Sequence, residues 1–175
     1  LIPKLFKFEY DGLLGWNLVW QATLPVPLQN TWPALTYGDW DNDGRKEIIW
    51  GPVNFTGSTN PNPPRIVVYE YSGSGDALGV PDPNVPGNFL PNAKWSITST
   101  DNFNLRPIRW ELVDFTGDGN KELVYVSRVQ VAGPGNRFGV VRVSNIPNNG
   151  DGSETWTLLA SDEAGAITEG VAYDG

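Results

Sequence analysis

Short stretches of alternating apolar and polar residues run along the whole chain, and this pattern predicts β-strands. Lys4–Tyr10 is a clear case, because a strand with one buried face changes side-chain character at every second residue. No long stretch shows the periodicity of a helix. Glycine (20 residues) and proline (15 residues) are abundant among the 175 residues, as is typical of short strands joined by turns. The predicted strands are Lys4–Tyr10, Trp16–Thr23, Ala34–Gly38, Lys46–Trp50, Arg65–Tyr71, Lys94–Thr98, Ile108–Val113, Glu122–Val129, Gly139–Ser144, Thr155–Ala160 and Ala166–Tyr173.

The chain contains an internal repeat. The segment Asp39–Trp50 returns in similar form as Asp114–Tyr125, and a tryptophan precedes each copy at the same spacing, Trp20 in one case and Trp95 in the other. A repeat of this kind sets the architecture, because each copy is one structural unit that packs against its neighbours. Each unit is predicted to hold four strands, with an acidic loop between the first and the second.

The first acidic loop has the spacing of a calcium site. Asp39, Asp41 and Asp43 occupy alternate positions, a glycine follows, and Glu47 closes the segment. Calcium takes about six to eight oxygen ligands, and the glycine permits the sharp turn that brings these side chains together. The carbonyl of Arg45 is the further predicted ligand. The carboxylates would repel one another without a cation.

The second loop offers a similar set of oxygens. The predicted ligands are the side chains of Asp114, Thr116, Asp118 and Glu122 and the carbonyl of Asn120. Because a neutral threonine replaces one carboxylate, we expect weaker calcium binding here. The alternative interpretation is that both loops are polar hairpin turns, since Asp-Gly is a common turn dipeptide.

An EF-hand does not fit these loops, because it needs a bidentate glutamate at its twelfth position between two helices. Trp50 and Tyr125 stand at that position, and β-forming residues precede them. An acidic residue at position nine followed directly by a strand resembles the FG-GAP / VCBS-type repeat of calcium-binding β-propellers, with the VCBS-type version the closer. The residues that carry the resemblance are Asp39, Asp41, Asp43, Gly44, Glu47, Asp114, Asp118, Gly119 and Glu122.

The resemblance implies an all-β fold of four-stranded antiparallel, propeller-type blades. Residues 1–31 would form a partial blade, 32–106 and 107–168 a blade with one acidic loop each, and 169–175 the start of a further repeat. About two and three-quarter blades do not close within one chain, because propellers have about four to eight. Exposed sheet edges must be covered. Three arrangements could cover these edges: assembly with copies of the chain, neighbouring blades of a longer protein, or a different packing such as a sandwich.

Composition narrows the possible functions. Histidine and cysteine are absent, which excludes a Ser-His-Asp triad, a cysteine nucleophile and the usual zinc ligands, and we expect no enzyme. The net charge of −8 argues against nucleic acid as a partner, and no apolar run is long enough for a transmembrane helix. Methionine is absent even at position 1. An exported chain whose leader has been removed would explain this, as would a fragment of a larger protein.

These observations predict an extracellular or cell-surface calcium-binding module with a structural or adhesive role, self-assembling through its unpaired terminal strands. The alternative is a piece of a secreted carbohydrate-binding or polysaccharide-cleaving propeller. Glycans are possible partners, since an exposed pair among Trp16, Trp32 and Trp110 could stack on a sugar. The long connections 52–64 and 72–92 are candidate contact loops.

Overall fold

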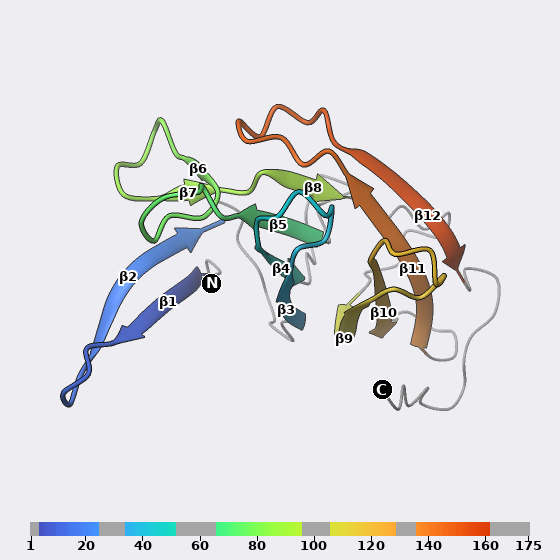
Figure 1. The fold of residues 1–175 in the computed structure, drawn as a ribbon, viewed down its shortest axis with the longest axis horizontal. Coiled ribbons are helices and arrows are strands. Elements are labelled where there is room, and N and C mark those ends of the chain that lie inside the picture. The colour runs from blue at the N-terminus through green and yellow to red at the C-terminus, as the bar shows by residue number, and fades with distance from the viewer. Residues whose placement is uncertain (1–3, 25–33, 52–65, 96–105, 129–135, 162–175) are drawn as a thin grey trace.

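The computed structural model describes residues 4–24, 34–51, 66–95, 106–128 and 136–161, and all regular structure in these ranges is β (Figure 1). None of these residues belongs to a helix that could cross a membrane. The strands are β1 (Lys4–Tyr10), β2 (Trp16–Thr23), β3 (Ala34–Gly38), β4 (Glu47–Gly51), β5 (Ile66–Glu70), β6 (Val80–Pro81), β7 (Phe89–Leu90), β8 (Ala93–Trp95), β9 (Arg106–Val113), β10 (Glu122–Arg128), β11 (Asn136–Ser144) and β12 (Thr155–Ser161).

The strands form two four-stranded antiparallel sheets. The first sheet has the order β3-β4-β5-β8 and the second the order β9-β10-β11-β12, so that nearly every strand pairs with the next one along the chain. A hairpin of β1 and β2 precedes them, and the small β6-β7 sheet is inserted before β8. No sheet among the described residues closes on itself.

The alternating pattern located most strands correctly. The predicted segments up to Lys94–Thr98 correspond to β1 to β5 and β8, and the later ones to β9 to β12. Two short strands, β6 and β7, arise in the 72–92 connection, where no strand was predicted, because two-residue strands carry no readable periodicity. The predicted strand Ala166–Tyr173 and the 52–64 connection lie outside the described residues.

The main hydrophobic core lies between the two four-stranded sheets. Ile49 and Val68 of the first sheet and Leu123 and Val141 of the second are wholly buried in it. The first strands of the two sheets, β3 and β9, lie next to each other. Apolar burial of this kind stabilises a fold by about 25 cal/mol per Å². Each sheet therefore covers one face of the other.

Two tryptophans stack across this core. The rings of Trp95 and Trp156 lie 5.8 Å apart at an interplanar angle of 14°, and Trp40 meets Trp156 edge-on at 5.6 Å. Trp95 and Trp156 belong to the outermost strand of their own sheets, and both point into the same intersheet space. Trp156 therefore completes the core that Trp95 enters and does not begin a further one.

The β1-β2 hairpin covers the opposite face of the first sheet. Trp20 packs edge-on against Tyr69 at 5.5 Å, and its indole N–H donates to the carbonyl of Leu78 at 2.9 Å. Val67 and Trp50 complete this second core. The first four-stranded sheet is thus covered on both faces, by the second sheet on one side and by the hairpin on the other.

Candidate metal centre

The first acidic loop links β3 to β4 and brings four carboxylates together. One carboxylate oxygen from each of Asp39, Asp41, Asp43 and Glu47 lies within 4.8 Å of the others. The loop turns through backbone conformations with positive φ, 62° at Asn42 and 90° at the following glycine. The sequence prediction that these four acids converge is therefore confirmed, and their oxygens are hard ligands of the kind that calcium takes.

Glu47 is the most unusual member of the group. Its side chain is fully buried at the start of β4, and Oε2 accepts a hydrogen bond of 2.5 Å from the backbone N–H of Trp40. Oε1 is buried with no hydrogen-bond partner, and so is Oδ1 of Asp39. Burial, together with the nearby charges of Asp41, Asp39 and Glu70, raises the pKa of Glu47 to about 8. A buried acceptor without a donor is costly, and a bound cation would satisfy it.

The remaining contacts of Asp41 and Asp43 hold the loop in shape. Asp41 accepts from the N–H of Ile146 at 2.9 Å and from the N–H of Asp43 at 3.3 Å, while burial raises its pKa. Asp43 accepts from the N–H of Arg45 at 2.8 Å. The predicted role of the Arg45 carbonyl as a ligand stays a prediction.

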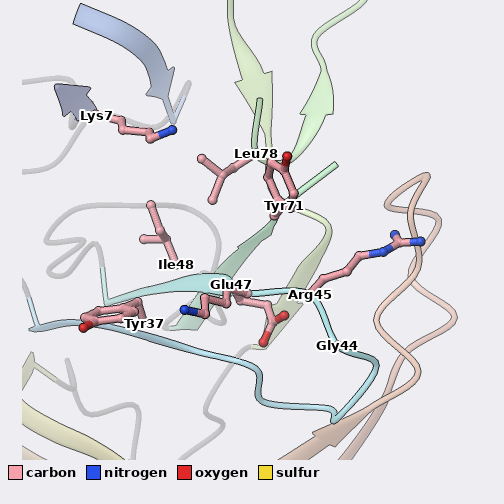
Figure 2. A pocket seen from close by; sticks show the side chains of 9 residues that line it. Lys7, Tyr37, Gly44, Arg45, Glu47, Ile48, Tyr71 and Leu78 are labelled. Carbon is pink, nitrogen blue, oxygen red and sulfur yellow. The ribbon is translucent and has the colours of Figure 1, made fainter. Parts of the chain in front are cut away.

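A buried acid and a guanidinium form the rim of the first loop. Nη1 of Arg45 donates to Oε1 of Glu70 at 2.8 Å and also to Asn148. Glu70 is buried, its Oε2 has no partner, and burial raises its pKa. Nε of Arg45 lies 3.7 Å from Asp43, and Figure 2 shows the side chain extending away from Ile48. Of the four clustered acids, Arg45 therefore approaches only Asp43.

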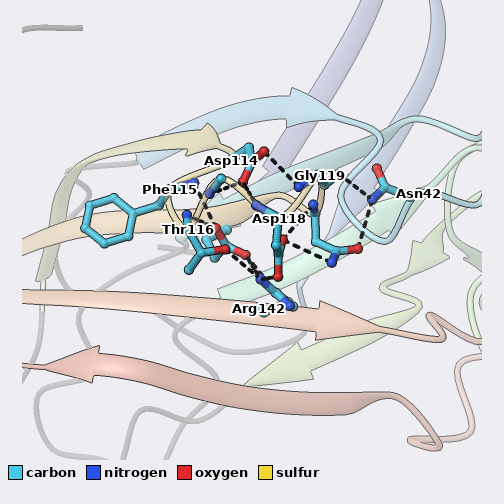
Figure 3. Close-up of polar contacts among 10 residues, drawn as sticks. Asn42, Asp114, Phe115, Thr116, Asp118, Gly119 and Arg142 are labelled. Carbon is cyan, nitrogen blue, oxygen red and sulfur yellow. Dashed lines mark hydrogen bonds and ion pairs between the residues drawn. The ribbon is translucent and has the colours of Figure 1, made fainter.

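The second loop, between β9 and β10, has a different arrangement (Figure 3). The guanidinium of Arg142 on β11 contacts three predicted ligands, with Nη2 3.1 Å from Oγ1 of Thr116 and 2.9 Å from Oδ2 of Asp118, and Nε 2.7 Å from Oε1 of Glu122. The N–H of Asn120 and this guanidinium lower the pKa of Asp118 to about 2. A protein cation thus lies among the oxygens predicted to bind calcium.

Asp114 uses its carboxylate within the second loop. Oδ1 accepts from the N–H of Gly117 at 2.7 Å and Oδ2 from the N–H of Gly119 at 2.9 Å. Glu122 accepts on Oε2 from the N–H groups of Phe115 and Thr116. Asn120 donates its N–H to Asp118 at 2.9 Å, and its carbonyl stays a predicted ligand. These hydrogen bonds give the carboxylates of the second loop donors without a metal ion.

The two loops touch each other. Nδ2 of Asn42 donates to the carbonyl of Gly119 and to Oδ1 of Asn120, both at 3.3 Å. Nζ of Lys121 donates to the carbonyl of Asp39 at 2.6 Å. A positive charge from the second loop therefore lies beside the first.

The sequence did not predict that three charged residues contact the loops, namely Glu70, Arg142 and Lys121. Glu70 and Arg142 come from the third strand of each sheet, and the connection before that strand is longer in the first repeat than in the second, so the fixed spacing of the repeat does not align them. Strand pairing does align them, because Glu47 stands opposite Glu70 and Leu123 opposite Val141. A charged residue on the third predicted strand of each repeat is the sequence signal that could have identified Glu70 and Arg142.

A cavity of about 550 Å³ opens beside the first loop, between the hairpin and the first sheet (Figure 2). Tyr37 and Tyr71 contribute rings to it, Lys7 and Lys46 contribute charges, and Glu47 lies at its inner side. No family model, curated protein or solved structure matches this chain. The acidic loop and this cavity are the two features of the molecule that bear on its function.

Proposed function

We propose that this chain is a calcium-binding β-repeat module with a structural or adhesive role at the cell surface or outside the cell. The observation that carries the proposal is Glu47, a fully buried carboxylate with one oxygen unpartnered inside a cluster of three aspartates. Burial of charge without compensation is unfavourable. A divalent cation supplies that compensation, and four carboxylates with carbonyl and water oxygens match the ligand preference of calcium.

The role of calcium here is to stabilise the fold. The loop acids of the first sheet lie against the second, since Asp41 accepts a hydrogen bond from Ile146 in the connection between β11 and β12. An ion that binds only the folded chain adds about 2.7 kcal/mol of stability at a concentration one hundred times its dissociation constant. Magnesium prefers a smaller, near-octahedral shell and holds its water, so we expect the loop to select calcium.

The two sheets are, in this proposal, blades of a propeller-type assembly. Each is a meander of four antiparallel strands, the sheets pack face to face, and their first strands adjoin. These are properties of propeller blades, which are arranged radially with their first strands toward the centre. The hairpin β1-β2 corresponds to the outer half of a preceding blade, since it covers the first sheet as that sheet covers the second.

We further propose that a second copy of this chain covers the outer face of the hairpin. Val67 and Tyr69 on β5 are wholly buried in the core that they share with the hairpin and with Leu78 and Phe89, whereas the corresponding Phe6 and Phe8 on β1 are half exposed, at 50% and 51%. Tyr10 extends the same row. The repeat thus indicates that a further repeat unit belongs on this face, and exposed strand edges favour such pairing.

Calorimetric titration with calcium and with magnesium tests the proposed metal site, and light scattering in calcium and in chelator tests assembly. Calcium binding that raises the melting temperature, with magnesium much weaker, would support the module. Absence of calcium binding at millimolar concentration would refute it.

The cavity beside the first loop supports a second candidate function, the binding of an acidic saccharide as part of a longer propeller. Tyr37 is exposed on its rim, and the charge of Lys46 lies near it. Aromatic faces provide flat apolar contact, and cations attract sugar carboxylates. Affinity electrophoresis in polygalacturonate, with neutral dextran as control, tests this. Retardation that Tyr37→Ala abolishes would favour it over the purely structural role.

A further inference from the structure

The two acidic loops differ most in what lies opposite their last acidic residue. In the first sheet Glu47 on β4 pairs with Glu70 on β5. In the second sheet Leu123 pairs with Val141, and antiparallel pairing therefore brings the preceding Glu122 beside Arg142. The same place on the third strand holds an acid in one repeat and a guanidinium in the other.

The guanidinium of Arg142 lies among the oxygens of the second loop that were predicted to bind a metal ion. It donates to side-chain oxygens at the third, fifth and ninth loop positions, Thr116, Asp118 and Glu122. Figure 3 shows the side chains of Thr116 and Asp118 turned toward it. Hydrogen bonds of a guanidinium to carboxylates are charge-assisted and fix the geometry of both partners.

The other acceptors of the second loop are also satisfied. Asp114, at the first position, accepts from three backbone N–H groups of its own loop. Among the described residues, the buried side-chain oxygens without a partner include Oδ1 of Asp39 and Oε1 of Glu47 in the first loop and none in the second. The second loop therefore does not fit a metal ion while Arg142 stays in place.

In the first sheet the opposite-strand residue adds negative charge to the site. Glu70 is 1% exposed and one of its oxygens is unpartnered. The arginine of that loop, Arg45, binds Glu70 from the rim, at 2.8 Å, and approaches only Asp43 of the clustered acids, at 3.7 Å. The side chain of Arg45 makes no hydrogen bond or ion pair with the inner acids Asp39, Asp41 and Glu47 among the described residues.

We propose that this single cross-strand position selects the cation of each loop: Glu70 leaves the first loop open to calcium, and Arg142 serves as the built-in cation of the second. The chain then binds one calcium ion, and its second loop is held in shape without metal. This inference rests on the proposed function and narrows it, since the sequence alone predicts two sites. Calcium does not replace Arg142 in the second loop, because displacing Arg142 would leave a partly buried charge without its acidic partners.

A reciprocal exchange of charge tests the inference by calcium titration calorimetry. We expect one ion per wild-type chain, two per chain for Arg142→Glu, and at least tenfold weaker binding for Glu70→Arg. Arg109→Glu is the matched control, because Arg109 is an exposed arginine of the same sheet that contacts Glu111 and lies outside the loop contacts. It should bind one ion like the wild type. Circular dichroism establishes that each variant is folded, and Arg142→Gln, which should also bind two ions, replaces Arg142→Glu if that variant does not fold.

The outcomes separate the two proposals. A wild type that binds no calcium overturns the proposed function itself. A wild type that binds two ions, or one ion with no gain in either Arg142 variant, overturns only the selection by this position. The side-chain Nε–H signal of Arg142 in ¹⁵N NMR spectra gives an independent check. The chemical shift of this signal should not change when calcium is added to the wild type. A calcium-dependent change to the chemical shift of a free guanidinium would contradict the inference.

Discussion

The carboxylate of Asp41, a candidate calcium ligand in the loop between β3 and β4, accepts a hydrogen bond of 2.9 Å from the backbone N–H of Ile146, two residues after the end of β11. Ile146 is itself buried in the core between the sheets. The ligand cluster and the packing of the two sheets are therefore linked through one side chain. Calcium bound at Asp41 would hold the position of both sheets, as the proposed structural role of the ion requires.

This link predicts a difference between two substitutions of Asp41. Asp41→Ala should lower the free energy of unfolding by about 1–3 kcal/mol even in chelator, because the buried N–H of Ile146 loses its acceptor. Asp41→Asn keeps an acceptor oxygen, so its stability in chelator should stay close to that of the wild type while its calcium affinity falls. Urea unfolding with and without calcium measures both effects. Equal stability of the two variants in chelator would contradict the link.

Glu47→Gln is expected to change stability in opposite directions with and without calcium. In chelator the variant should unfold at a higher temperature, because Glu47, with its raised pKa, must take up a proton or bury a charge beside Asp39, Asp41 and Asp43 on folding, and glutamine does neither. In calcium it should melt lower than the wild type and bind the ion about tenfold or more weakly, since affinity depends on the charge of the ligands. Differential scanning calorimetry in both conditions measures this.

The control for Glu47→Gln is Asp11→Asn. Asp11 accepts the N–H groups of Leu13 and Gly15 in the β1-β2 turn, far along the chain from either acidic loop, and asparagine can make the same turn. Its calcium-dependent shift in melting temperature should equal that of the wild type. If Asp11→Asn and Glu47→Gln lose the shift alike, calcium acts through general charge and not through this loop.

The stacked pair Trp95 and Trp156 is expected to be a main source of stability between the sheets. Trp156→Ala removes a large ring that contacts both Trp95 and Trp40, and we expect a loss of about 3 kcal/mol in the free energy of unfolding. Trp16→Ala is the matched control, because that tryptophan is 68% exposed on the hairpin. Urea unfolding of the monomeric fraction measures the difference, and an equal loss for both variants would argue against the intersheet core.

The strands and the first acidic loop could be predicted because their signals are local. Alternation along Lys4–Tyr10 and the spacing from Asp39 to Glu47 each lie within one short segment. Contacts that depend on how strands pair and sheets pack could not. Arg142 reaches the second loop only through the register of β10 and β11, and Ile146 meets Asp41 only through the packing of two sheets. The sequence therefore predicts two similar calcium loops, the second weaker, and the fold places Arg142 among the oxygens of the second alone.

Assembly through the hairpin gives the last prediction. Phe6→Lys combined with Phe8→Lys should reduce the mass measured by light scattering in calcium to that of the 19.2 kDa chain, because two charges cannot be buried where aromatic rings pack. Their inner neighbour Leu5 is untouched, so the hairpin should stay packed on the first sheet and calcium binding should be unchanged. Leu14→Lys at the turn, where that leucine is 98% exposed, is the control and should assemble normally. Normal assembly of the double variant would show that copies meet elsewhere, and a wild type already monomeric in calcium would favour neighbouring blades of a longer chain as the cover of this face.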